Sequence, residues 1–389
     1  MDIAFTHASV IGEQDILSDG AVLVRQGVVA WMGPTAQLPA TGAEIIDLGG
    51  FFLAPGLIDI HVHGAAGLDA SSCDVSGLKT ICRTHEATGT TSLCLTVLPS
   101  PPGQLRTALA NIQQIASEGS GGARVLGAYL EGPFVNPTRV DAAQERWIVE
   151  PELAALKALA VAAGGWLRIV TLAPELPGTE ELIQWLAHDM GLVAAIGHTS
   201  ATCEQTQQAI AGGVKLASHL FNGMKPFHHR DPNAAGAVLA AEATFAELIL
   251  DGVHLHPTAA AMAYRCLGPD RMVLVTDATS IVGAGDGRGE VGGRPIHYEA
   301  GAARFDDGQI AGSALTMIDA VRYAIDKLGL SYAEAIRCAS LTPAELLGID
   351  DRLGSIQVGK HADLLVLDRS DLRVLYSYVG GRRIFRSPY

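Results

Sequence analysis

The chain has 389 residues, of which 48% are hydrophobic and 17% are charged, and its formal net charge is −14. This hydrophobic content is enough for a large core and argues against a disordered chain. The acidic excess argues against nucleic acid or an anionic membrane as a partner.

The sequence shows no targeting segment, because its beginning lacks the basic region and apolar core of a secretory signal. The longest apolar segment, "LAALKALAVAAGGWLRIVTL", is interrupted by Lys157, two glycines and Arg168, so we predict a helix followed by a strand rather than a membrane span. Six cysteines are scattered without a C-x-x-C pair, which predicts reduced thiols. We therefore expect a cytoplasmic protein.

Short β-like runs with glycine turns mark both ends of the sequence. The first part contains "GAVLVRQGVVAWMG" and "AEIIDLGGFFLAPG", and the last part contains "GSIQVGKHADLLVLD" and "VLYSYVGGRRIF". Neither part is long enough for a good core alone. We predict that residues 1–54 and 355–389 fold together as one small β-sandwich domain.

Between the two ends, residues 55–354 alternate apolar runs with helical patterns. The predicted strands are 57–63, 91–98, 124–131, 167–172, 192–198, 214–219, 246–254 and 271–277. The predicted helices are 75–88, 103–117, 151–163, 179–190, 202–211 and 257–267, with another in "SALTMIDAVRYAIDKL". Eight such strands predict a parallel (β/α)8 barrel of the TIM type. An open doubly wound sheet is the alternative, which the absence of a G-x-G-x-x-G motif after the first strand disfavours.

A glycine-rich segment, residues 281–312, follows the last predicted strand. It lacks the G-K-[ST] ending of a phosphate-binding loop. We predict a loop and β-hairpin insertion there.

Ionisable residues stand at the ends of six predicted strands. They are His61 and His63, Glu131, His198, His219, His254 and Asp277. Each alone has an ordinary explanation as a core histidine, a loop residue or a helix cap. Together they would lie on the carboxyl-terminal rim of a barrel, where active sites are built. The side chains of His61 and His63 would point the same way, because alternate residues of a strand share a face.

Imidazole and carboxylate side chains are suited to zinc and similar divalent ions. Glu131, His198 and His219 would form a His2Glu set with an open position for water. His61 and His63 could hold a second ion, with Glu131 or Asp277 shared between the two.

This constellation resembles the amidohydrolase superfamily and, within it, the N-acetylglucosamine-6-phosphate deacetylases. The motifs that carry the resemblance are "PGLIDIHVHG", "LEGPF", "IGHTSA", "SHLFNGMKPFHHRDP", "LILDGVH", "LVTDA", "IAGSALTM" and "SLTPAELLGIDDRLGSIQVGKHADLLVLD". They span essentially the whole chain. The "HLFNGMKPFHHR" and "DGVH" segments are specific to the deacetylases, whereas the His-x-His pair and the final aspartate are general to the superfamily.

The resemblance implies a role for each matching residue. Glu131, His198 and His219 match the metal ligands, and Asp277 matches the catalytic acid and base. The matching sugar-phosphate contacts are Asn222, Gly223, Arg230, His254, Ile310, Ala311, Gly312 and Ser313. The fourth strand ends in "IVTLAPE" without a lysine, which disfavours dihydroorotase- and hydantoinase-like relatives.

The chain departs from this family in one segment. Many members carry a Gly-Ala-His-like sequence after "EGPF", whose histidine contacts the substrate. Here Ala142 and Ala143 occupy that place, and "VNPTRVDAAQERW" contains no histidine. We therefore expect either weak activity on N-acetylglucosamine 6-phosphate or a preference for a related N-acyl sugar phosphate.

The sequence as a whole predicts a metal-dependent deacetylase of an N-acetyl amino-sugar 6-phosphate. In it, Asp277 would take a proton from water and give it to the departing amine, and Arg230 would bind the phosphate. We expect one or two divalent ions, with Zn2+ favoured over Fe2+ or another metal, and a homodimer as in many family members. The alternatives are a deacetylase of another N-acyl hexosamine, such as the galacto epimer, another amidohydrolase, or a non-catalytic binding protein on the same fold.

Overall fold

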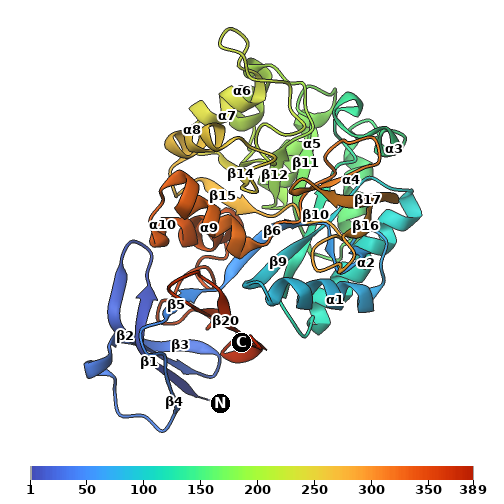
Figure 1. The fold of residues 1–389 in the computed structure, drawn as a ribbon. Coiled ribbons are helices and arrows are strands. Elements are labelled where there is room, and N and C mark those ends of the chain that lie inside the picture. Colours follow the sequence, from blue (N-terminus) through green and yellow to red (C-terminus); the bar gives the residue numbers. More distant parts are fainter. Residues whose placement is uncertain (1, 389) are drawn as a thin grey trace.

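The computed structural model describes residues 2–388, apart from the side chains of residues 142 and 143. Two large sheets organise the molecule (Figure 1). One is a parallel sheet from the middle of the chain. The other combines strands from both ends of the chain and lies to one side of the first.

The parallel sheet forms a nearly closed barrel. Its strands are β6 (Leu57–Val62), β9 (Thr90–Val97), β10 (Arg124–Glu131), β11 (Leu167–Leu172), β12 (Val193–Ile196), β13 (Leu216–Ala217), β14 (Phe245–Ile249) and β15 (Met272–Val275). These strands are almost wholly buried, as expected when helices cover a parallel sheet. The first and last strands meet through a parallel bridge between Val62 and Ala278. The predicted barrel is confirmed, although the seventh strand ends at Ile249 rather than at residue 254.

Helices follow most of the barrel strands and surround them (Figure 1). They are α1 (Val75–Glu86), α2 (Pro102–Glu118), α4 (Leu153–Ala162), α5 (Thr179–Gln184) with a π-helical continuation (Trp185–Asp189), α6 (Cys203–Ala211), α7 (Asn233–Ala240), α8 (Pro257–Leu267), α9 (Met317–Leu328), α10 (Tyr332–Ala339) and α11 (Leu341–Leu346). Local signals set several of their ends. Asp74 caps α1 through the backbone N–H of Gly77, and Thr202 and Gln205 form a reciprocal capping box on α6.

The second sheet joins both ends of the chain. Its strands are β1 (Ile3–Ile11), β2 (Ile16–Arg25), β3 (Val28–Pro34), β4 (Glu44–Asp47), β5 (Phe52–Pro55), β19 (Leu364–Leu367), β20 (Val374–Val379) and β21 (Arg382–Arg386). β5 pairs antiparallel with β19, so that Pro55 lies opposite Leu364. Phe5 packs edge-on against Tyr378 in the core of this end sheet. The shared end domain is confirmed, whereas its boundaries at residues 54 and 354 stay predictions.

A small three-stranded sheet covers the carboxyl end of the barrel. It consists of β16 (Arg288–Val291), β17 (Arg294–Glu299) and β18 (Ala302–Arg304), and it lies in the predicted insertion. Val291 and Phe305 pack with Leu98 from the loop after β9. A short hairpin of β7 (Gly64–Ala65) and β8 (Leu68–Asp69) supports it, because Asp69 accepts a hydrogen bond from the backbone N–H of Gly292 (2.7 Å).

All six cysteines are free thiols, as predicted. Within residues 2–388, the structure contains no helix long and apolar enough to cross a membrane.

Candidate metal and catalytic site

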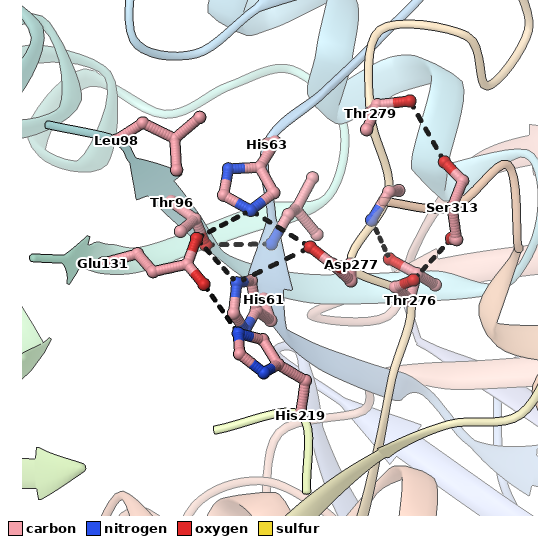
Figure 2. Close-up of polar contacts among 12 residues, drawn as sticks. His61, His63, Thr96, Leu98, Glu131, His219, Thr276, Asp277, Thr279 and Ser313 are labelled. Carbon is pink, nitrogen blue, oxygen red and sulfur yellow. Dashed lines mark hydrogen bonds and ion pairs between the residues drawn. The ribbon is translucent and has the colours of Figure 1, made fainter. Parts of the chain in front are cut away.

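The six predicted strand ends bring their ionisable side chains to one end of the barrel. A cavity of about 480 Å3 opens there, and its lining includes His63, Glu131, His198, His219 and Asp277. His61 lies just beneath this cavity and is fully buried. Figure 2 shows that the imidazole rings of His61, His63 and His219 face the carboxylates of Glu131 and Asp277.

Glu131 lies between two pairs of imidazoles. Its Oε1 is 2.8 Å from Nε2 of His198 and 2.7 Å from Nε2 of His219. Its Oε2 is 3.2 Å from Nε2 of His63 and 3.5 Å from Nε2 of His61. His61, His63 and Glu131 form one group, and Glu131, His198 and His219 form the other. In each group, one ligand atom from each residue lies within 4.8 Å of the others.

The donor set fits divalent metal ions. Nε2 of His61 is buried and makes no hydrogen bond within the described chain, although buried polar atoms normally have a partner. Imidazole nitrogens and a bridging carboxylate are ligands that suit zinc and related ions. The geometry therefore offers two candidate ligand sets that have Glu131 in common.

Surrounding acceptors fix the orientation of the rings. Nδ1 of His61 lies 2.9 Å from Glu247, Nδ1 of His198 lies 2.9 Å from the carbonyl oxygen of Arg139, and Nδ1 of His219 lies 3.0 Å from that of Asn222. A ring that donates from Nδ1 presents the Nε2 lone pair to the centre, which is the usual arrangement around a bound metal.

Glu247 was not among the residues predicted from the sequence. It lies within β14, is fully buried, and also accepts a hydrogen bond from the backbone N–H of His219 (3.0 Å). The available signal was a carboxylate inside the apolar run "FAELIL". A charged residue in a buried strand needs a partner, and here that partner is an imidazole of the site.

Opposite charges determine the protonation of these groups. Burial opposes ionisation of Glu131, but His61, His198 and His219 hold its pKa well below the usual value. Burial likewise opposes ionisation of Asp277, and the hydrogen bond with His63 lowers its pKa. The same carboxylates outweigh burial at His63 and raise its pKa to about 9. Protons and a metal ion therefore compete for these imidazoles.

Three of the site residues have left-handed backbone conformations. The φ angles are +44° at His198, +28° at His219 and +51° at Asp277. Residues other than glycine rarely adopt this backbone conformation, and those that do are concentrated at functional sites. In each case the residue follows the end of a short strand and turns its side chain into the cavity.

Asp277 is held from several directions. Its Oδ1 is 3.1 Å from Nε2 of His63, its backbone N–H donates to the carbonyl of His61 (3.0 Å), and its own carbonyl accepts from Ser313 (2.9 Å). Gly312 has a φ of +110°, and a Cβ there would lie 3.0 Å from the carbonyl oxygen of Asp277. Only glycine fits this close approach without strain.

Most of the predicted substrate contacts line the cavity, and two of them lie outside it. The lining includes Asn222, Gly223, His254, Ile310, Ala311 and Gly312. Ser313 is not in the lining: it is buried, and its hydroxyl donates to the carbonyl of Thr276. Arg230 is also outside it, on an exposed loop where its Nη1 donates to Nε2 of His229 (2.9 Å).

The side chains of Ala142 and Ala143 lie outside the described residues. Their backbone belongs to a short helix, α3 (Ala142–Glu145). The predicted loss of a substrate contact at these positions therefore stays a prediction.

Arg139 is a cavity residue that sequence reasoning missed. It ends the 3-10 turn of Pro137–Arg139, and among the described residues it is the only lysine or arginine in the lining. Its Nε donates to the hydroxyl of Ser200 (2.7 Å), which fixes the guanidinium. The available signal was an arginine eight residues after Glu131, in the loop before α3.

The chain is similar to a known protein family and to individual known enzymes. Residues 52–384 match the model of the amidohydrolase family. The chain is 35% identical over 382 residues to an N-acetylglucosamine-6-phosphate deacetylase of Bacillus subtilis (strain 168), covering 97% of this chain and 96% of that one. It is 36% identical over 371 residues to an N-acetylgalactosamine-6-phosphate deacetylase of Escherichia coli O157:H7, covering 95% and 96%.

The fold is similar to that of a solved deacetylase. The structure is that of a variant of N-acetyl-D-glucosamine-6-phosphate deacetylase from Mycobacterium smegmatis in complex with N-acetyl-D-glucosamine-6-phosphate. It superposes with a TM-score of 0.92 at 31% identity and covers 98% of this chain and 99% of that one.

Proposed function

This chain belongs to the amidohydrolase family, and we propose that it hydrolyses the N-acetyl group of N-acetylglucosamine 6-phosphate. The products are glucosamine 6-phosphate and acetate, and the enzyme is an amide hydrolase of amino-sugar catabolism. The observation that carries this function is the convergence of Glu131, His198, His219 and Asp277 in one cavity, in a chain similar over nearly its whole length to such deacetylases.

The cofactor is a divalent metal, and Zn2+ is the ion that the donor set favours. Glu131, His198 and His219 would hold one ion, and His61 and His63 together with Glu131 would be the ligand set for a second. A bound divalent ion supplies Lewis acidity and makes water a better nucleophile near neutral pH.

Asp277 is the proton carrier of the reaction. Its lowered pKa keeps it ionised, so it can accept a proton from the attacking water. It then donates that proton to the sugar nitrogen, because an amide nitrogen leaves poorly without one. In the described structure, Nε2 of His63 lies 3.1 Å from Oδ1 of Asp277, so a metal ion held by His63 would take the place of this contact.

The phosphate group is assigned to the cavity wall formed by Arg139, Asn222, Gly223 and His254. A guanidinium matches phosphate oxygens geometrically and keeps its charge. Arg230 lies outside this wall, and its role in binding phosphate stays a prediction. Comparison of Arg139→Ala with Arg230→Ala tests which arginine binds phosphate. Replacing the phosphate-binding arginine should raise KM, with a smaller change in kcat.

The galacto epimer is the second candidate substrate. It is supported by the similarity to the Escherichia coli enzyme and by alanine at position 143, where many family members have a histidine. Restoring the histidine by Ala143→His, with kcat/KM measured on both epimers, tests whether this position selects the sugar.

The experiment for the whole proposal is an acetate-release screen of the zinc-loaded enzyme. N-acetyl hexosamines are compared with and without a 6-phosphate, before and after removal of the metal with a chelator. We expect metal-dependent acetate release from the phosphorylated sugars. No release from any N-acetyl amino-sugar phosphate would overturn the function. The proposal also includes a homodimer, which light scattering tests separately.

A further inference from the structure

A second cavity lies at the opposite end of the barrel from the site described above. Its volume is about 300 Å3, and its lining includes Arg124 and Arg168. Arg124 is the first residue of β10, whose last residue is Glu131, and Arg168 stands near the start of β11. The cavity is therefore at the amino-terminal end of the strands, and we refer to it as the base cavity.

Three arginines and one histidine stand in the otherwise apolar wall of the base cavity. Arg124, Arg168, Arg352 and His361 line it, and among the described residues of the lining none is acidic. Arg352 and His361 come from the segment that leads into β19, and the backbone N–H of His361 donates to the carbonyl of Arg352 (2.9 Å). The base cavity thus lies where the barrel meets the end sheet.

Arg168 is held in place without neutralisation of its charge. Its Nε donates to the carbonyl of Leu126 (2.9 Å), and its Nη1 donates to those of Gly165 (3.0 Å) and Leu167 (3.1 Å). Within residues 2–388, no acidic side chain lies within ion-pair distance of it. Backbone carbonyls therefore orient the guanidinium in advance, which lowers the side-chain entropy that the protein would lose on binding an anion.

Arg124 adds an unused donor. Its Nη2 contacts both carboxylate oxygens of Asp363 (3.1 and 3.2 Å). Its Nε is buried and makes no hydrogen bond within the described chain, although buried polar atoms normally have a partner. Among the described residues, Arg352 pairs only with the neighbouring Asp351, and both side chains are exposed. The three arginines thus exceed the two carboxylates that pair with them.

We propose that the base cavity is a binding site for a small phosphorylated molecule. Phosphate oxygens match the guanidinium donors of Arg124, Arg168 and Arg352. Trp166 and Leu353 supply an apolar wall that suits the carbon skeleton of a sugar or a similar group. The inference goes beyond the proposed function and does not depend on it, because phosphate itself carries the recognised chemistry.

Calorimetric titration of the zinc-loaded enzyme tests this site with two probes, inorganic phosphate and glucosamine 6-phosphate. We expect glucosamine 6-phosphate to bind at two sites per chain, one in each cavity. The base-cavity variants Arg168→Gln and Arg352→Glu should weaken the second event at least tenfold and leave kcat for acetate release unchanged. Arg265→Gln, a change of an exposed arginine on α8, is the matched control and should leave both events unchanged.

The two variants keep the test decisive. Arg168 holds three carbonyls, so its variant could lose stability, whereas Arg352 is exposed and its variant should fold normally. Inorganic phosphate distinguishes the ligand sources: if it binds the base cavity as tightly as the sugar phosphate, the phosphate group alone is recognised. Identical titrations of the wild type and Arg352→Glu with both probes would overturn the proposal. A single wild-type event that Arg352→Glu abolishes would still support it, and would count against the proposed function instead.

Discussion

Glu131 provides one carboxylate oxygen to each of two histidine pairs. Replacing Glu131 by glutamine keeps the shape but removes the negative charge that favours binding of a divalent ion. We expect Glu131→Gln to lose most of its metal, with a correspondingly large loss of acetate release. Elemental analysis of the purified variant measures this directly.

The control for this change is Glu181→Gln, which alters an exposed carboxylate on α5. It should retain the full metal content. If Glu131→Gln retained as much metal as this control, the assignment of Glu131 as the shared ligand would be wrong.

In the proposed function, Asp277 transfers protons and does not bind metal. Asparagine at this position can neither accept nor donate the proton, so Asp277→Asn should lower kcat by about 10²–10⁴-fold, with KM and metal content nearly unchanged. Steady-state kinetics and elemental analysis of the same preparation check both statements. A large loss of metal in this variant would instead make Asp277 a ligand.

The strand-end pattern was sufficient to find the central residues of the site. His61, His63, Glu131, His198 and Asp277 could be predicted because alternation and barrel topology bring strand ends together. Glu247 and Arg139 could not be found in this way. Their positions depend on which strand faces His61 and on how the loop after Glu131 turns, and both are set by long-range packing.

At the scale of single elements, periodicity located most helices and strands but not all their ends. The seventh strand stops at Ile249 because Asp251 begins a turn: its side chain accepts the backbone N–H groups of Val253 and His254. The helix α7 was not predicted from "NAAGAVLA". An alanine- and glycine-rich sequence has little contrast between a buried and an exposed face, so its helical period is weak.

Helix α1 carries a buried titratable group, His85, near its end. Nε2 of His85 contacts the carbonyl oxygen of Gly64 (3.1 Å), while Nδ1 has no partner within the described chain. Burial lowers the pKa of His85 to about 4, and the Gly64 carbonyl only partly opposes this. The ring is therefore neutral in the folded enzyme.

This histidine makes stability depend on pH. Its unfolded pKa is about 6.5, so the contribution of His85 is complete above that pH and is lost as the pH falls from about 6.5 toward 4. The difference corresponds to about 3 kcal/mol. His85→Gln should therefore show a shallower loss of stability between pH 7 and pH 4.5. Denaturant unfolding curves across that range check this, and parallel pH profiles of the two proteins would contradict it.

At the scale of the whole molecule, one ion pair joins the barrel to the end sheet. Asp363, which is 6% exposed, contacts Arg124 on β10 and also accepts the backbone N–H of Gly380 (2.7 Å). Asp363→Ala removes both contacts, and we expect the free energy of unfolding to fall by about 2 kcal/mol. Asp363→Asn, which keeps an acceptor oxygen, should lose less. Denaturant unfolding measures both, and an unchanged alanine variant would show that the pair contributes nothing.

The architecture could be predicted from the order of its segments. Eight apolar runs separated by helical patterns favour a closed parallel barrel, and two β-rich ends that are each too short for a core favour a shared sheet. The order of strands in that sheet could not be predicted. The pairing of Pro55 with Leu364 depends on where the finished barrel delivers the two ends.

The same pairing sets an order of events during synthesis. β1, β2, β3 and β5 leave the ribosome early, and β5 can pair with β1 at once, but its second partner is β19, which emerges only after the whole barrel. Such distant pairing forms slowly, because a long loop must close first. Until then the edge of β5 is an open template for other strands. The nascent chain is therefore most exposed to aggregation just before its last segment is made.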